Sequence, residues 1–149
     1  MFIFVIFLCY NTRMRNYYNN GNSIKKDTAY TGIKTTDDLY DILLSCWTEE
    51  TCTSRLRTKF SENNKTAGQC AITAFLTQDV FGGEIYATET GRGKHWYNVV
   101  EEAKNLKYDL SFKLDTRESI WNETQKKERY EILRENFLKA VGGDCLKTR

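Results

Sequence analysis

Two segments of this chain carry apolar residues at every third or fourth position, a spacing that places them on one face of a helix. The first begins at Thr35, which has the spacing of a capping box with Asp38. The second covers residues 122 to 141 and stops at a glycine pair. Its apolar positions are Tyr130, Leu133, Phe137 and Val141, and those of the first are Leu39, Ile42, Leu43, Cys46 and Trp47. A shorter stripe predicts a helix within residues 49 to 60.

The centre of the chain joins a wholly apolar segment to alternating ones. Residues 70 to 81 are apolar nearly all round, which is typical of a buried helix, and Gly82-Gly83 ends it. Apolar and polar residues then alternate over residues 84 to 88, 95 to 100 and 106 to 112, as in half-buried strands. We therefore expect an α+β fold, in which a buried, cysteine-bearing helix packs on a small antiparallel sheet between flanking helices.

The first 34 residues do not follow either period. Residues 1 to 10 are almost wholly apolar but too few to span a bilayer as a helix, and residues 11 to 31 are polar and rich in asparagine. We expect an apolar and then disordered tail over 1–34, followed by one domain over 35–149. A buried strand, a misassigned start and a membrane tether through residues 1–10 are the alternatives for the apolar stretch, the tether being disfavoured.

Composition narrows the class of protein. The net charge is +2 and basic residues do not run in blocks, which argues against nucleic acid as a partner. The five cysteines are odd in number and form no CxxC pair, so we expect a reducing, cytoplasmic setting without a disulfide framework. A single histidine and scattered cysteines predict no metal site, and no motif implies an organic cofactor.

The candidate chemistry starts at Cys70, which follows Gly68-Gln69 and opens the apolar helix. Helix N-termini favour the thiolate through their N–H groups and dipole. His95, the only histidine, opens a predicted strand, and Asp109 lies on the next one. A thiol, a base near neutral pH and a carboxylate that orients the base have the order of a nucleophilic triad.

Neighbouring residues are candidates for substrate binding. The Gln69 side chain and the backbone N–H of Cys70 are candidate donors to an oxyanion. Trp96 and Asn98 flank His95 on its strand and are candidate pocket residues. Each has a structural alternative: a solvated loop amide, a core aromatic and a strand-edge cap. Cys70 itself has the alternative of an ordinary buried cysteine.

Two family resemblances rest on these residues. The GQC string at a helix start, a strand opening with histidine and a following strand with aspartate resemble the transglutaminase-like branch of the papain-like superfamily. That resemblance implies a nucleophile at Cys70, a base at His95 and an orienting acid at Asp109. The strings SCWTEET, GQCAITAFLTQDVFGGEIY, HWYN and YDLS also resemble the YunG-like family of small bacterial proteins, whose function is unassigned.

This chain departs from the YunG-like pattern in two places. Trp96-Tyr97 follows His95 where the family favours the reverse order, and Ser111 stands in the segment after Asp109 where a threonine is expected. These departures touch the pocket lining and a strand boundary. The expected function is thiol-dependent acyl transfer on a peptide, amide or ester substrate, as a hydrolase, deamidase or transamidase. The alternative is a binding or regulatory module that keeps the fold without catalysis.

Overall fold

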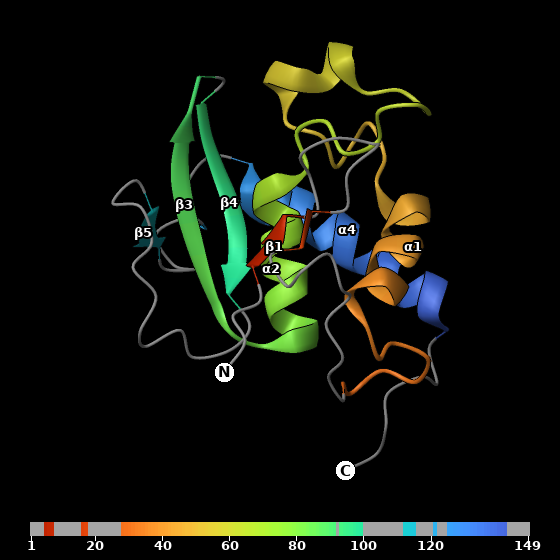
Figure 1. Cartoon of the computed structure of the whole chain (residues 1–149). Coiled ribbons are helices and arrows are strands. Elements are labelled where there is room, and N and C mark those ends of the chain that lie inside the picture. Colours follow the sequence, from red (N-terminus) through yellow and green to blue (C-terminus); the bar gives the residue numbers. More distant parts are fainter. Residues whose placement is uncertain are drawn as a thin grey trace.

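The computed structural model consists of helices packed against an antiparallel sheet (Figure 1). The structure describes residues 5–7, 16–17, 28–91, 93–99, 112–115, 121 and 125–142. The elements in chain order are β1 (Val5–Phe7), β2 (Asn16–Tyr17), α1 (Thr36–Cys46), the 3₁₀ helix η1 (Ser54–Lys59), α2 (Cys70–Phe81), β3 (Glu84–Thr90), β4 (Gly93–Val99), β5 (Phe112–Asp115) and α4 (Lys126–Val141). The α+β class expected from the sequence is confirmed.

The sheet is antiparallel, with the strand order β2-β1-β4-β3-β5. Strands β3 and β4 form its longest ladder, from the Glu84–Val99 pair to the Thr90–Gly93 pair at the hairpin turn. Helix α2 packs against these two strands, and α4 contacts both α2 and α1. Figure 1 shows β3 and β4 on one side of α2 and α1 on the opposite side.

Helix α1 begins where its sequence predicts. Thr35 is the N-cap, and its side-chain oxygen accepts a hydrogen bond from the backbone N–H of Asp38 at 3.1 Å. The Asp38 carboxylate in turn accepts from the backbone N–H of Thr35 at 2.8 Å, which completes the capping box. It also accepts from the N–H of Lys34 at 2.9 Å. The start of α1 is thus closed by its own side chains.

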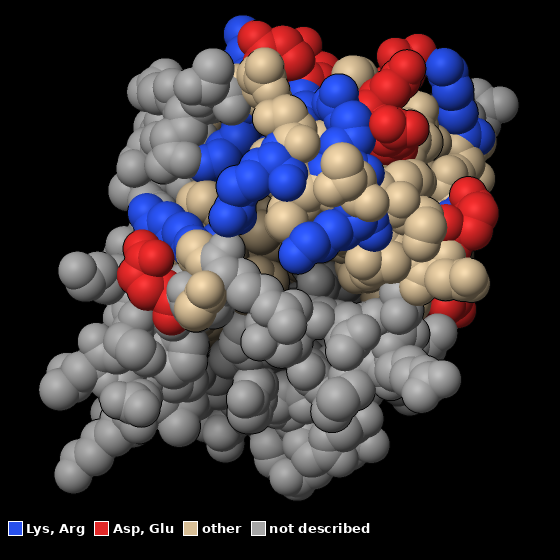
Figure 2. Space-filling view, turned by 90° about the horizontal axis from the view of Figure 1, so that it is seen from above, with Lys and Arg blue, Asp and Glu red and all other residues tan. Residues whose placement is uncertain are grey.

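The segment between α1 and α2 differs from the expected helix over residues 49–60. Only Ser54–Lys59 is helical, as a 3₁₀ turn that buries none of its residues. Cys52 is buried, but Leu56 and Phe60 are only half-buried, so the three residues do not form one buried helix face as predicted. Figure 2 views this upper end of the molecule and shows Lys and Arg side chains gathered over it.

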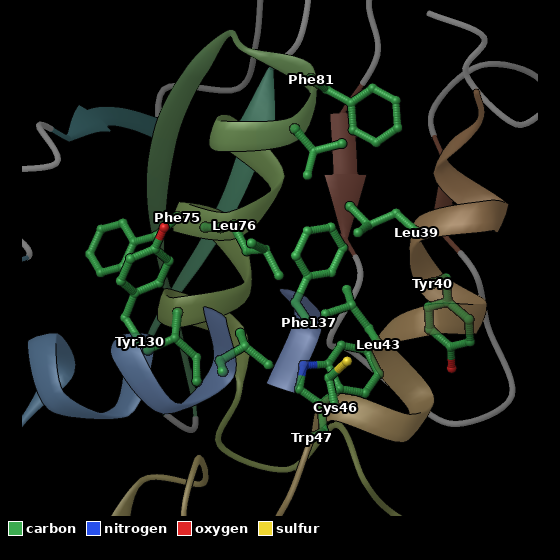
Figure 3. Packing of buried hydrophobic residues seen from close by; sticks show 14 of the residues in the cluster. Leu39, Tyr40, Leu43, Cys46, Trp47, Phe75, Leu76, Phe81, Tyr130 and Phe137 are labelled. Atoms are coloured by element: carbon green, nitrogen blue, oxygen red, sulfur yellow. The ribbon is translucent and has the colours of Figure 1, made fainter. Parts of the chain in front are cut away.

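The core lies between helices α1, α2 and α4 and one face of the sheet (Figure 3). Leu43 and Trp47 from the α1 end of the cluster lie beside Phe137 of α4. Phe75 of α2 packs edge-on against Tyr130 of α4, with 5.6 Å between the ring centres. Trp47 also donates its indole N–H to the Thr73 hydroxyl of α2 at 3.0 Å, which satisfies two buried polar groups at once. Apolar burial on this scale is the main stabilising contribution to the fold.

The packed region starts before Thr35. Ile33 is fully buried in the core cluster, and the Thr28 hydroxyl donates to its carbonyl at 2.7 Å. Strands β1 and β2 lie in the stretch for which the sequence favours a tail, and β1 pairs with β4 at Val99 and Asn98. Within the apolar stretch, the described residues Val5–Phe7 form a strand, as in one of the alternatives stated for it. In the described part of the chain, no helix combines the length and apolarity needed to cross a bilayer.

Candidate functional site

Cys70 is the first residue of α2. The start of this helix is its upper end in Figure 1, below the η1 segment. The residue before Cys70, Gln69, is the N-cap, and its side chain makes no capping hydrogen bond to the helix. Gly68 reaches this start through a left-handed backbone conformation with φ of +68°. Cys70 is half-buried, whereas the seven residues that follow it in α2 are buried. Cys70 is therefore the half-buried beginning of a helix whose next two turns are enclosed.

Opposing influences act on the Cys70 thiol. Burial is the largest of them and raises its pKa. Hydrogen bonding from the backbone of Trp96 and Ala71 lowers the pKa, and so do the positive charges of Arg129 and Lys126. The net direction is upward, so burial outweighs the helix start, whose effect alone favours the thiolate. The groups placed to stabilise a thiolate here are two backbone amides and two cations of α4.

Arg129 is a buried cation that connects three segments around this thiol. Its Nη1 donates to the carbonyl of Gly68 at 3.0 Å and to that of Thr51 at 3.2 Å. Burial lowers its pKa, while the neighbouring Cys70 and Cys52 thiols act in the opposite direction. Carbonyl oxygens compensate part of the cost of burying a charge, and the guanidinium remains charged at neutral pH.

Lys126 and Trp96 form the other side of the site. The Lys126 ammonium lies 4.2 Å from the centre of the Trp96 ring, and the Lys94 ammonium lies 5.6 Å from it. Both distances are within the range of cation–π attraction. Trp96 is half-buried and packs partly against the core, so it is also a core aromatic residue, the alternative stated for it above. Its ring attracts two positive charges, one of which, that of Lys126, acts on the Cys70 thiol.

The two candidate amides are engaged within the fold. Gln69 is fully buried and donates its Nε2 to the carbonyl of Thr48 at 3.1 Å. Asn98 is buried and donates its Nδ2 to the carbonyl of Ala74 at 2.8 Å, which ties β4 to α2. The Gln69 bond fixes the loop before η1 to the start of α2, and the Asn98 bond fixes α2 against the sheet. The Gln69 donor expected at an oxyanion is occupied by Thr48 in this arrangement.

His95 lies on the face of β4 that the sequence pattern predicts, together with Tyr97. Asn98 bonds to α2, so the alternate side chains of this strand point toward that helix. Tyr97 stacks on Tyr86 at 5.9 Å between ring centres, on the opposite face. Strand alternation places His95 with Tyr97, away from the face that α2 covers. The pairing of His95 with Cys70 stays a prediction.

The state of the imidazole follows from its surroundings. His95 is buried, and burial lowers its pKa. The ring is therefore neutral at pH 7 and has the protonation state that a base requires. The third predicted member, Asp109, lies outside the described residues. Among the residues that the structure does describe, no group of three or more His, Cys, Asp or Glu side chains is arranged to hold a metal ion.

Sequence reasoning missed Arg129 and Lys126, although the chain contains a signal for both. They continue the buried stripe of α4 toward its N-terminus, because each lies four residues before a buried stripe position, Leu133 or Tyr130. Both are buried in the structure. A cation on the apolar stripe of a helix needs a compensating partner, and carbonyls and an aromatic ring supply it here.

Comparisons with known proteins give one family. The family described as YunG protein matches residues 35–142, the region from the capped start of α1 to the end of α4. An uncharacterized protein named YunG from Bacillus subtilis (strain 168) is 32% identical over 87 residues, which cover 53% of this chain and 75% of that protein. No solved structure matches this chain.

Proposed function

This chain belongs to the YunG family, and from that premise we propose that it catalyses thiol-dependent acyl transfer with Cys70 as the nucleophile. The observation that carries the proposal is the position of this thiol. It is a half-buried group at the start of a buried helix, beside two backbone amides and two cations. In the proposal, α2 and the sheet form the core of a papain-like fold, and the setting is cytoplasmic, where free thiols persist.

The Cys70 thiol first gives its proton to a base, for which His95 is the candidate, and the resulting thiolate attacks the carbonyl carbon of an amide or ester. A carbon–sulfur bond forms and the carbon–nitrogen or carbon–oxygen bond breaks, with the proton delivered to the departing amine or alcohol. Water or an amine then attacks the thioester, which releases the acyl product and restores the thiol. Asp109 is the proposed group that orients His95.

Three groups support this role beside the thiol. The cations Arg129 and Lys126 favour the thiolate and any negative charge that develops on the attacked carbonyl. The backbone N–H of Cys70 is the proposed oxyanion donor, since the Gln69 amide bonds to Thr48. The substrate is a peptide or amide of a kind that these residues leave open.

The experiment uses an activated ester, p-nitrophenyl acetate, with the full-length protein. We expect acetylation of Cys70 and turnover beyond one equivalent, read by peptide mass spectrometry and nitrophenolate release. Cys46 and Cys52, the other free thiols of the described chain, are internal references because burial raises the pKa of each. Cys70→Ala should abolish turnover. Equal turnover in Cys70→Ala, or no acetylation of Cys70 in the folded wild type, overturns the proposal.

A separate variant tests the base. We expect His95→Gln to lower turnover about 100-fold or more, the typical contribution of a general base, with the fold preserved by circular dichroism. Unchanged turnover in this variant removes His95 from the mechanism while leaving Cys70 as the nucleophile. That outcome would agree with the placement of His95 on the other face of β4.

The second candidate is a non-enzymatic binding or regulatory module of the same fold. Two observations favour it: burial raises the pKa of Cys70, and both candidate amides, Gln69 and Asn98, bond within the fold. In that case the activated ester would acetylate Cys70 no faster than a neutral reference thiol. The same mass-spectrometric readout therefore decides between the two candidates.

A further inference from the structure

Five basic side chains from three elements surround the Cys70 site. Lys126 and Arg129 come from the first turn of α4, and their charges act directly on the Cys70 thiol. Lys94 comes from β4 and shares the Trp96 ring with Lys126. These positions bring the start of α4 and the hairpin end of β4 to the start of α2.

The other two members come from η1. The charge of Arg57 reaches the Cys52 thiol and lowers the pKa of Arg129, so the two guanidiniums lie near each other. The guanidinium of Arg55 lies over the start of β4, since a methyl group built on Gly93 would be 3.3 Å from its Nη2. We call Arg55, Arg57, Lys94, Lys126 and Arg129 the basic cluster.

The surface agrees with this grouping. Figure 2 shows Lys and Arg gathered near the middle of the described part of the upper face, with Asp and Glu mostly toward its edges. Glu49 is the carboxylate whose charge reaches Cys52 in this region. Like charges held together repel one another, so the fold concentrates positive potential here at a cost in stability. Carboxylates are present as well, since Glu89 lies opposite Lys94 in the β3–β4 ladder, but the basic side chains outnumber them. A half-buried site in which one sign of charge predominates raises the local concentration of the opposite ion.

We propose that the basic cluster binds an anionic group, a carboxylate or a phosphate, on the acyl substrate of Cys70. Arg55 and Arg57 offer planar guanidiniums, which bind either group with two parallel hydrogen bonds. Lys94 and Lys126 lie over the Trp96 ring and add two point charges, and that of Lys126 acts on the thiol itself. That the anion belongs to a substrate rests on the proposed function. The binding of an anion beside Cys70 is tested independently of turnover.

The probes are iodoacetate and iodoacetamide, which differ in a negative charge. Their rates at Cys70 are measured in full-length protein by peptide mass spectrometry, and their ratio is compared with that of N-acetylcysteine amide, a neutral reference thiol. We expect the iodoacetate-to-iodoacetamide ratio at Cys70 to exceed the reference ratio by about fivefold or more at low salt and to fall as salt rises. A ratio at or below the reference overturns the proposal.

Variants show which charges act. Arg57→Gln and Lys126→Gln should each lower the ratio about twofold to fivefold, and Arg57 is exposed, so its substitution leaves the fold intact. Lys139→Gln is the matched control, because Lys139 is an exposed lysine of α4 paired with Glu135 at 2.7 Å. An equal decrease with Lys139→Gln would mean that only the net charge matters and would overturn a site at the cluster.

Protection of Cys70 from labelling distinguishes a phosphate from a carboxylate as the bound anion. Inorganic phosphate and acetate, at matched ionic strength, compete with iodoacetamide labelling of Cys70. Slower labelling with phosphate alone assigns the cluster to a phosphate group, and slower labelling with acetate alone assigns it to a carboxylate. Protection by neither, at concentrations up to tens of millimolar, contradicts an anion site. Failure here leaves acetylation by the neutral ester untouched, so the two proposals fail separately.

Discussion

Helices α1 and α2 begin in different ways, although a left-handed glycine precedes each of them. At α1, Thr35 and Asp38 cap each other's backbone and close the helix start. At α2, the N-cap Gln69 makes no such bond, and the first residue is a half-buried cysteine beside two cations. The start of α1 is therefore capped by its own side chains, whereas the start of α2 has no side-chain cap and carries a half-buried thiol that can take part in chemistry.

The largest effect is expected at the glycines that lead into these helices. At Gly68, a methyl group would lie 2.8 Å from the Cys52 sulfur and 2.9 Å from the Thr53 nitrogen, besides the strain of φ at +68°. At Gly32, with φ of +85°, no atom lies within 4 Å of such a methyl group. Gly68→Ala should therefore lower the free energy of unfolding by about 2 to 5 kcal/mol, and Gly32→Ala by about 1 kcal/mol.

Urea denaturation at pH 7 measures both variants against the wild type. The difference between them isolates the close packing before α2, because both substitutions bear the strain of a left-handed alanine. Equal losses in the two variants would contradict tight packing of Gly68 against Cys52 and Thr53.

An intermediate effect is expected at the N-cap of α2. Gln69→Ala removes a fully buried side chain and its 3.1 Å bond to Thr48, which should cost about 1 to 3 kcal/mol. The loss should loosen the loop rather than the helix. Hydrogen exchange should rise first at the Cys52 amide, which bonds to the carbonyl of Thr48. Thr35→Ala is the control, with faster exchange in the first turn of α1; the same response in α2 would mean that Gln69 does act as a cap.

The smallest effect is expected at the cap of α1, and it depends on pH. The backbone N–H of Lys34, above all, holds the pKa of Asp38 below its ordinary value. The carboxylate therefore stabilises the fold fully above about pH 3.9, the unfolded value, and this contribution is lost as the pH falls through the lower folded value. Asp38→Asn should cost about 1 kcal/mol at pH 7 and less at pH 2 to 3.

Denaturation of the Asp38→Asn variant and the wild type, repeated from pH 7 downward, checks this expectation. The two free energies of unfolding should converge only at the acid end. A constant difference over the whole range would mean that the charge of Asp38 adds nothing to its hydrogen bonds.

Local pattern was sufficient for most of the fold. The capping box at Thr35, the buried helix over 70–81 and the glycine stop after Phe81 appear where the sequence places them, since each depends on neighbours in the chain. Residues 49–60 do not form the expected helix, because Leu56 and Phe60 make too few apolar contacts to hold a regular helix against the core. The β1 strand was one alternative among several, since its partner β4 lies far along the chain, at residues 93 to 99.

The site was predicted in part. Cys70 occupies the helix start expected from its glycine and glutamine neighbours. The cations beside it were not predicted, because Lys126 and Arg129 come near the thiol only when α4 packs on α2. Alternation correctly grouped His95 with Tyr97, but it does not state which face of the sheet a helix will cover. Such facts belong to tertiary packing, which short-range spacing does not encode.

The pairing of β1 with β4 has a consequence for the order of folding. The β3–β4 hairpin joins neighbouring residues, whereas the pairing of Val5 with Val99 closes a loop that runs from residue 5 to residue 99. Loop closure costs more entropy as the loop lengthens, so the hairpin and α2 should assemble first and β1 should join last. Until then one edge of β4 is a free template for strands of other copies, and a nascent or shortened chain should aggregate more readily than the finished one.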